Sequence, residues 1–298
     1  MSIYFEMGAI VQDTTVIGQV SAAPINANVE FAKHGRAGAL NNSFIAALSQ
    51  RPTIDISSTD IKGMLDFTGT KGLDIVTNPV DLYYLPIADG GTVATTGAVK
   101  ASVNAGMMIP TQLSMGNEQV ATINSTLYIK GDGTNEPVVY STGQTEPTAT
   151  EADRMYTFAK FNYNSIDYDI EDLTLNFGVK PIVKGGQGTG YPSYIAYNQQ
   201  LTSLSFTTND YTQLSTVTPT GGLIDETLII YLARLEHGGV RYADVETEHI
   251  KITIGNGSIR QDSIPNSYRE TGLVPYTFEP FYDGVNSFMT IDTASAIT

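Results

Sequence analysis

The acidic residues after Ser165 form the densest group of side chains in this sequence that could bind a metal ion or act as a catalytic pair. Asp167, Asp169 and Glu171 alternate along the chain, so a strand through them would carry all three on one face. Carboxylates placed in this way could hold a calcium ion between subunits, act as the acid pair of a glycosidase, or form a solvated acidic face. We favour the solvated face, and the sequence predicts no metal site.

The other groups with catalytic potential are scattered along the chain. The histidines His34, His237 and His249 fall in different predicted elements, and no GxSxG motif places a serine beside any of them. The chain has no cysteine, which removes disulfides, thiolate catalysis and thiolate metal sites together. The glycine-rich run at 185–190 lacks the spacing of a phosphate-binding loop. We therefore expect no catalytic residue, no cofactor and no enzymatic activity.

The charge balance limits the partners of the chain. Asp and Glu number 31 against 16 Lys and Arg, which gives a net charge of −15. Proteins that bind nucleic acid contact its phosphates through Lys and Arg, so this balance argues against such binding. An acidic surface would let nucleic acid pass without adhering, or it would serve solubility alone. The N-terminus has no basic region, and no apolar stretch reaches the length of a membrane span, so we expect a soluble protein made in a cytoplasm.

Short turn dipeptides between alternating apolar runs predict four β-hairpins, because Asp-Gly and Asn-Gly supply the positive φ angles of tight turns. Their flanking segments are 82–88 with 92–103, 121–130 with 137–141, 245–254 with 258–264, and 276–282 with 285–291, and their turns are Asp89-Gly90, Asp132-Gly133, Asn256-Gly257 and Asp283-Gly284. Pro86 cannot donate a backbone hydrogen bond, which indicates an edge strand. The chain is thus predicted to be mainly β.

Periodicity adds strands and helices to this framework. Thr53–Phe67 and Ser165–Phe177 alternate as strands do. The run Asp225–His237 carries an apolar face at helical spacing and is the one strong predicted helix, and Ser43–Leu48 is a second, short one. The expected fold is a β-sandwich or barrel flanked by one amphipathic helix.

A polar segment at 142–153, with Pro147 and repeated threonines, is the best predicted linker. It would separate a β-rich domain at 1–145 from a second at 154–298. The two alternating runs, Thr53–Phe67 and Ser165–Phe177, resemble each other across this linker. The likeness fits an internal duplication or two unrelated strands, and a single domain with a large insertion remains an alternative.

Many hairpins, one amphipathic helix, no cysteine and low charge density together resemble the tail-tube (major tail) proteins of bacteriophages. That resemblance implies a β-sandwich flanked by a helix, with a long hairpin arm that stacks one ring on the next. The helix would be Asp225–His237, and the sandwich strands would include Thr53–Phe67 and Ser165–Phe177. The arm would be Leu82–Val103, with Leu82, Tyr83, Tyr84, Pro86, Asp89 and Gly90 as its candidate inter-ring residues.

The resemblance also implies partners and a location. The chain would assemble with itself into stacked rings, in trimers if it holds two tube domains and otherwise in hexamers, and would contact other tail proteins. DNA would pass through the tube without specific binding, beside a lumen face carrying Asp167, Asp169 and Glu171. The protein would reside in the virion tail after synthesis in the host cytoplasm, without a membrane partner.

Two other classes share this composition. One is another phage structural protein, such as a neck, decoration or fibre-associated β-domain. The other is a carbohydrate-binding module or glycosidase that uses exposed tyrosines, for example Tyr83-Tyr84 or the cluster at 276–282, as sugar platforms. The absence of tryptophan, the best such platform, weighs against the second class.

Overall fold

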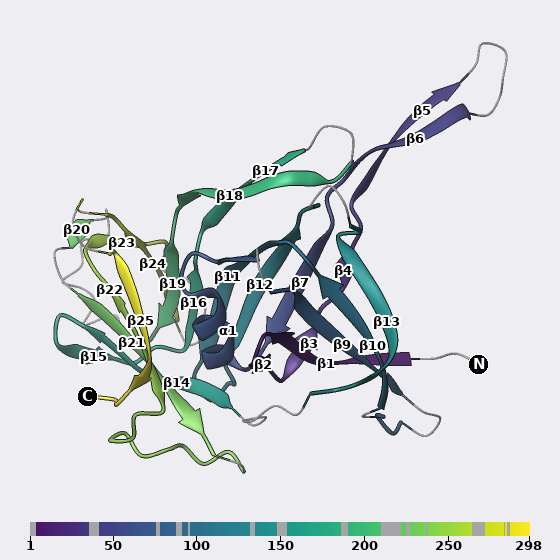
Figure 1. Cartoon of the computed structure of the whole chain (residues 1–298). Helices are drawn as coiled ribbons and strands as arrows, with labels where there is room; N and C mark the ends of the chain where they lie inside the picture. Colours follow the sequence, from purple (N-terminus) through teal and green to yellow (C-terminus); the bar gives the residue numbers. More distant parts are fainter. Residues whose placement is uncertain are drawn as a thin grey trace.

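A computed structural model describes residues 4–35, 42–75, 78–87, 91–94, 96–131, 135–147, 154–185, 190–209, 222–224, 227–236, 238–263, 272–282, 284 and 287–298. Within them the chain is mainly β, as predicted, with antiparallel sheets and one short helix (Figure 1).

The first half of the chain forms two layers. A five-stranded sheet, ordered β13-β10-β9-β1-β2, consists of β1 (Tyr4–Gln12), β2 (Thr15–Ile17), β9 (Val80–Ile87), β10 (Thr96–Val103) and β13 (Val138–Thr145). The facing layer consists of β3 (Val20–Ala22), β4 (Ile25–Asn26), β7 (Thr53–Ser58), β8 (Leu73–Ile75), β11 (Gly106–Gly116) and β12 (Thr122–Ile129). Alternate residues of both layers meet in one buried apolar cluster that includes Ile10, Leu82, Ile56 and Leu127.

The second half repeats this arrangement. Its five-stranded sheet consists of β14 (Met155–Tyr163), β15 (Ile166–Tyr168), β21 (Leu228–Leu235), β22 (His249–Ile254) and β25 (Met289–Ser295). The facing strands are β16 (Asp172–Asn176), β19 (Ser203–Thr208), β20 (Gly222–Ile224), β23 (Gly257–Gln261) and β24 (Val274–Pro280). Phe161 and Phe206 join the two layers with ring centroids 4.9 Å apart.

The strand pairing of the two halves agrees residue by residue. In the five-stranded sheets, Ile10 lies opposite Leu82 and Phe161 lies opposite Ile230, and each ladder has an irregularity just before these residues. In the facing layers, Gly106 pairs with Ile129 at the start of β11, and Gly257 pairs with Pro280 at the start of β23. We call β1 to β13 with α1 the first repeat (Tyr4–Thr145) and β14 to β25 the second repeat (Met155–Ser295).

Each repeat also carries a two-stranded hairpin between corresponding strands. In the first repeat β5 (Val29–Gly35) pairs with β6 (Asn42–Gln50), and in the second β17 (Val179–Gly185) pairs with β18 (Pro192–Gln200). The β5–β6 hairpin extends away from the body of the molecule, whereas β17–β18 runs over the first repeat (Figure 1).

One strand joins the repeats into a single sheet. β11 pairs with β8 through its first residues and with β16 of the second repeat through its last, from Gln112 opposite Asn176 to Gly116 opposite Asp172. The result is an 11-stranded sheet that runs through both repeats. β3 and β4 lie at the end of this sheet that belongs to the first repeat. They correspond to β16 of the second repeat, because they pair with β7 in the same way that β16 pairs with β19.

The helix α1 (Ile61–Thr68) lies where the sequence predicted the end of a long strand. The strand stops at Ser58, and Asp60 caps the helix by accepting a hydrogen bond from the Gly63 amide at 3.0 Å. Ile61, Met64 and Leu65 recur at helical spacing and are buried. The prediction of strand across all of Thr53–Phe67 was therefore wrong after Ser58.

Both predicted helices are strands. The predicted helix at Asp225–His237 is occupied by β21, which lies between β14 and β22, while Asp225, Glu226 and His237 lie outside the described residues. Its run of buried apolar residues suits a strand covered on both faces as well as a helix. Ser43–Leu48 lies within β6. In both places, pairing with neighbouring strands overrides local helix propensity.

Only the first of the four predicted hairpins is confirmed as a strand pair. β9 pairs with β10, although the Asp89-Gly90 turn lies outside the described residues. After β12, β22 and β24 the chain passes from one sheet to the other, because each of these strands pairs with strands other than the one that follows it, and Asp132, Gly133 and Asp283 lie outside the described residues. A tight-turn dipeptide fixes a change of direction but not the partner of the strand that follows.

The predicted linker begins inside a strand, because residues 142–145 belong to β13, and residues 148–153 lie outside the described part. The predicted alternating run Ser165–Phe177 is divided into β15 and β16, with a break at residues 169–171. The strand that corresponds to β7 is β19, not this run.

Candidate assembly surfaces

The residues predicted to form an inter-ring arm lie inside the first repeat. β9 is flanked by β1 and β10, so it is not the edge strand that Pro86 suggested. Leu82 is fully buried, and the Tyr84 hydroxyl donates to the Ala23 carbonyl at 2.9 Å. Tyr83 is half-buried opposite Lys100, and Asp89 and Gly90 lie outside the described residues. An inter-ring role for this segment stays a prediction, and β5–β6 is the hairpin that extends away from the body of the molecule (Figure 1).

The three predicted lumen acids do not share one strand face. Asp167 lies in β15, Asp169 follows its end and Glu171 precedes β16. Asp167 is largely exposed and pairs with Lys160 at 3.0 Å, and a hydrogen bond from Asn162 at 2.7 Å holds the pKa of its carboxyl below the ordinary value. The main chain of Asp169 accepts a hydrogen bond from Thr208, which fixes the turn between the layers. A lumen role for these acids stays a prediction.

The outer face of the 11-stranded sheet is mostly hydroxyl and amide across β7, β12, β11, β16 and β19, and it carries charged side chains such as Asp172, Arg260 and Glu279 elsewhere. Cross-strand neighbours share a face, so the face opposite the core is lined by a continuous series of hydroxyl and amide side chains: Thr53, Ser57, Gln112, Ser114, Thr122, Asn124, Thr126, Thr174, Asn176, Ser203, Ser205 and Thr207. Asp55 is a carboxylate on this face, bound by Thr126 at 2.9 Å and Asn26 at 3.2 Å. Sequence patterns do not predict this surface, because its residues come from strands distant in the chain.

One end of the same face is apolar and covered. Met107 and Ile109 of β11 pack against Ile195 of the β17–β18 hairpin, and Tyr128, Val179 and Val183 surround them. The Gly131 amide donates to the Pro192 carbonyl at 2.8 Å, which ties the hairpin to the first repeat. The second repeat's hairpin is therefore docked on the sheet of the first.

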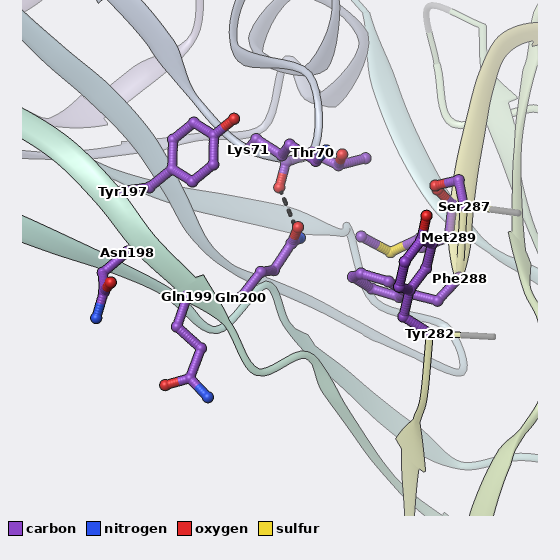
Figure 2. Close-up of a pocket in the computed structure, with 10 residues that line it drawn as sticks. All are labelled: Thr70, Lys71, Tyr197, Asn198, Gln199, Gln200, Tyr282, Ser287, Phe288 and Met289. Carbon is purple, nitrogen blue, oxygen red and sulfur yellow. Dashed lines mark hydrogen bonds between the residues drawn. The ribbon is translucent and has the colours of Figure 1, made fainter. Parts of the chain in front are cut away.

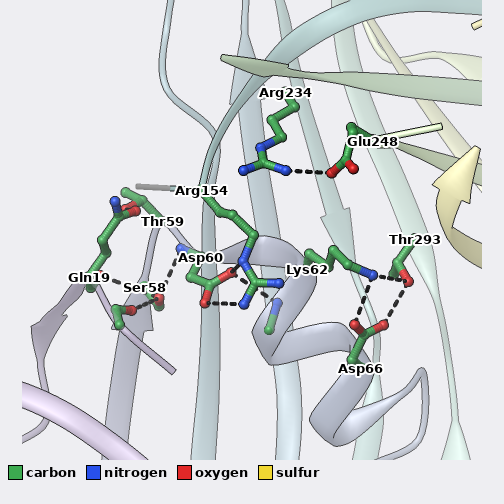
Figure 3. A network of polar contacts seen from close by, with 12 residues as sticks. Gln19, Ser58, Thr59, Asp60, Lys62, Asp66, Arg154, Arg234, Glu248 and Thr293 are labelled. Carbon is green, nitrogen blue, oxygen red and sulfur yellow. Dashed lines mark hydrogen bonds and ion pairs between the residues drawn. The ribbon is translucent and has the colours of Figure 1, made fainter. Parts of the chain in front are cut away.

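Polar side chains fasten the repeats together at α1 (Figure 3). Asp60 pairs with Arg154, which precedes β14, at 3.4 Å; the Asp60 side chain is buried and that of Arg154 is 15% exposed. Two residues further along, Lys62 contacts Asp66 at 3.0 Å and Thr293 of β25 at 3.1 Å. Figure 3 shows both contacts extending from α1 toward the second repeat. We call these residues the junction clasp.

A surface pocket lies beside the junction (Figure 2). It is lined by Thr70, Lys71, Tyr197, Asn198, Gln199, Gln200, Tyr282, Ser287, Phe288 and Met289. The Gln200 side-chain amide donates to the Thr70 carbonyl at 3.0 Å, which links β18 to the end of α1. The described residues that line this pocket include no histidine, aspartate or glutamate.

The predicted sugar platforms are placed differently from what their sequence suggested. Tyr276 is buried and stacks on Phe206 with centroids 5.5 Å apart. Tyr83 and Tyr84 lie in a central strand. Tyr282 is exposed at the pocket of Figure 2.

His249 has a structural position in the core. It is fully buried, its Nδ1 accepts a hydrogen bond from the Arg234 amide at 3.1 Å, and its Nε2 lies 2.9 Å from the Ala243 carbonyl. Accepting at Nδ1 and donating at Nε2 is the pattern of a neutral imidazole. Both ring nitrogens are therefore engaged with the backbone.

Among the described residues there is no group of three or more His, Asp or Glu side chains placed to hold a metal ion. In the same part of the chain, no helix has the length and apolar character needed to cross a membrane. A scan against models of known protein families finds no matching family, and no curated protein matches the sequence.

Proposed function

We propose that this chain is a structural protein that assembles head to tail with copies of itself into rings, and that the rings stack into the hollow tail tube of a bacteriophage. One observation carries the proposal: the chain contains the same sandwich twice, joined by β11 and β16, and the edge corresponding to β16 is left open at β3–β4. The β11–β16 joint uses one sheet edge inside the chain, and the equivalent edge at β3–β4 is free to make the same joint with another copy. Such head-to-tail association closes into a ring when the rotation between successive copies permits.

The open edge can accept a strand by the same rules as the internal joint. Ile25 and Asn26 hold in the first repeat the places of Leu175 and Asn176 in the second, since each pair lies opposite matching residues of β7 and β19. No described strand pairs with the far side of β3–β4. Edge strands present unpaired amide and carbonyl groups that another chain can satisfy. Trimeric rings would contain six repeats in pseudo-sixfold arrangement.

The polar face of the 11-stranded sheet is the surface that we assign to the lumen. Along β7, β11, β12, β16 and β19 this face carries no Lys or Arg, the residues on which phosphate binding depends. DNA could therefore move along this face without adhering, helped by the net charge of −15. In this proposal the protein needs no cofactor, acts in the virion tail after synthesis in the host cytoplasm, and has other tail proteins as further partners.

Electron microscopy of the purified protein, before and after concentration, tests this function. We expect rings or stacked hollow tubes. The variant Ala22→Lys places a charge on the open edge strand and should prevent assembly, whereas Thr247→Lys adds the same charge on an exposed loop and should not. Particles that remain single copies at every concentration, or tubes that form equally well from Ala22→Lys, would count against the proposal.

A further inference from the structure

The β5–β6 and β17–β18 hairpins correspond at every pair of residues. Lys33 lies opposite Ile45 in the first hairpin, and Val183 lies opposite Ile195 in the second. Both ladders are interrupted twice, at matching places near the base and near the tip. The two hairpins are thus equivalent elements of the two repeats. They differ in their contacts, because β17–β18 packs on the sheet of the first repeat and β5–β6 extends away from the body of the molecule.

The burial of one isoleucine measures this difference. Ile195 is 6% exposed because it packs on Met107 and Ile109 of the first repeat, whereas Ile45, at the same place in the other hairpin, is 59% exposed. Phe44 and Leu48 of β6 are also mostly exposed, and the hairpin extends away from the body in Figure 1. An exposed apolar group of this kind marks an interaction surface.

We propose that the β5–β6 hairpin of one copy lies on the outer face of β23 and β24 in a second copy, as β17–β18 lies on β11 and β12 within the chain. This inference rests on the proposed head-to-tail assembly and names the contact that reinforces it. The internal repeat identifies the docking surface. In the second repeat Ser258 lies opposite Glu279, as Met107 lies opposite Tyr128 in the first repeat. Arg260 accordingly takes the place of Ile109.

The corresponding residues are complementary in charge. Val183 of the docked hairpin and Tyr128 of β12 line the same hollow, and their counterparts in the other repeat are Lys33 and Glu279. Lys33 is exposed on the free hairpin, and Glu279 is exposed on β24, 3.7 Å from Arg260. An apolar contact within the chain thus becomes a Lys33–Glu279 ion pair between chains. The aliphatic part of Arg260 offers Ile45 an apolar surface beside this pair.

Charged side chains in place of apolar ones suit the outer face of β23 and β24, because this face is exposed to water until a second copy binds. A face carrying Ser258, Arg260 and Glu279 can stay in water before assembly, whereas an exposed face of Met107 and Ile109 would favour random association. It also makes the contact between copies sensitive to salt, unlike the contact within the chain.

Charge reversal and cross-linking test the contact. Lys33→Glu and Glu279→Lys should each raise the protein concentration needed for assembly several-fold at low salt, and the double variant should recover most of that loss. Because the chain has no cysteine, Lys33→Cys and Glu279→Cys proteins can be mixed and treated with a short bismaleimide. We expect cross-linked dimers that contain one of each. Lys184→Cys, on the hairpin already docked within its own chain, is the matched control and should give no dimer with Glu279→Cys.

Each outcome bears on one proposal or on both. Mixed dimers together with rescue by the double variant support the docking. Rings or tubes without mixed dimers would overturn the docking and leave the tube function standing. Dimers of Lys33→Cys with itself would replace the head-to-tail contact by a two-fold one and overturn the docking. Neither assembly nor dimers at any concentration would overturn both.

Discussion

At the scale of single residues, the junction clasp adds side-chain ion pairs and hydrogen bonds to the backbone ladder that joins the repeats. The Asp60 carboxylate has two roles, since it caps α1 and balances the largely buried guanidinium of Arg154. A buried ion pair adds little compared with a well-packed apolar pair, but the loss of one partner is costly because the remaining charge stays out of water. Removal of one partner of the Asp60–Arg154 pair is therefore expected to lower stability more than the intact pair raises it.

Asp60→Ala should lower the free energy of unfolding by about 3 kcal/mol, through the lost cap and the unbalanced Arg154. Asp66→Ala is the control, because its side chain is 44% exposed and its pair with Lys62 should contribute less than about 1 kcal/mol. Urea denaturation of both variants measures the difference. Equal losses for the two would show that the buried pair is no more important than the exposed one.

Tyr84 should make stability depend on alkaline pH. Burial raises the pKa of its phenol from 10.0 to about 12, so the unfolded chain ionises first as pH rises. Its contribution is fully present below pH 10.0 and is lost as pH approaches 12. Tyr84→Phe also loses the bond to the Ala23 carbonyl, so we expect it to be less stable than the parent by about 1 kcal/mol near neutral pH.

The stability gap between the parent and Tyr84→Phe should therefore narrow above pH 10.0. Urea midpoints of both proteins across this range provide the measurement, and the other tyrosines affect both proteins alike. A gap that stays constant with pH would mean that the phenol of Tyr84 is not protected from ionisation by the fold.

At the scale of elements, the sequence predicted the β class but not the pairing of the strands. Alternation identified β7 and β16, since each has one face in the core and one in solvent. β21 was mistaken for a helix because it is apolar on both faces, which removes the two-residue period. The signal for α1 was present in Asp60 followed by apolar residues at helical spacing, but the preceding alternation obscured it.

The repeat also left a signal in the sequence. Residues 52–60, PTIDISSTD, and 202–210, TSLSFTTND, share the alternation of β7 and β19, and the burial of the two strands is identical along their length. Asp132-Gly133 and Asp283-Gly284 follow the corresponding strands β12 and β24. The candidate assembly surfaces could not be predicted in this way, because the burial of Ile195 against Ile45 depends on which sheet lies below each hairpin.

The two matching glycines that begin β11 and β23 should be equally intolerant of a side chain. A Cβ at Gly106 would lie 2.3 Å from the Tyr128 carbonyl oxygen, and one at Gly257 would lie 2.3 Å from the Phe278 ring and 2.8 Å from the Glu279 carbonyl. Gly106→Ala and Gly257→Ala should each cost about 1–3 kcal/mol in the free energy of unfolding.

Gly185→Ala, where a Cβ would meet nothing within 4 Å, is the control and should change stability by less than about 0.5 kcal/mol. Thermal or urea unfolding of the three variants decides the point. A neutral Gly106→Ala would indicate that the close approach of β11 to β12 is not required in the first repeat.

At the scale of the whole molecule, the repeats form one continuous sheet with an apolar inner face and a polar outer face. In the proposed assembly, a ring of copies would enclose the hydroxyl and amide side chains that line this face along β7, β11, β12, β16 and β19. The same argument explains why one end of the sheet is open and one hairpin is uncovered, because both would be satisfied by neighbouring copies.

Enclosure of the polar face can be measured by cysteine labelling. Ser205→Cys lies exposed on that face in β19, and Thr290→Cys lies exposed on β25 of the opposite layer. Before assembly, both should react with a small maleimide and with a maleimide attached to a bulky carrier protein. In assembled tubes, Ser205→Cys should keep its reaction with the small reagent and lose the bulky one, because only small molecules enter the lumen, while Thr290→Cys should keep both. Tubes in which the bulky reagent still reaches Ser205→Cys would place the polar face outside and require a different lumen.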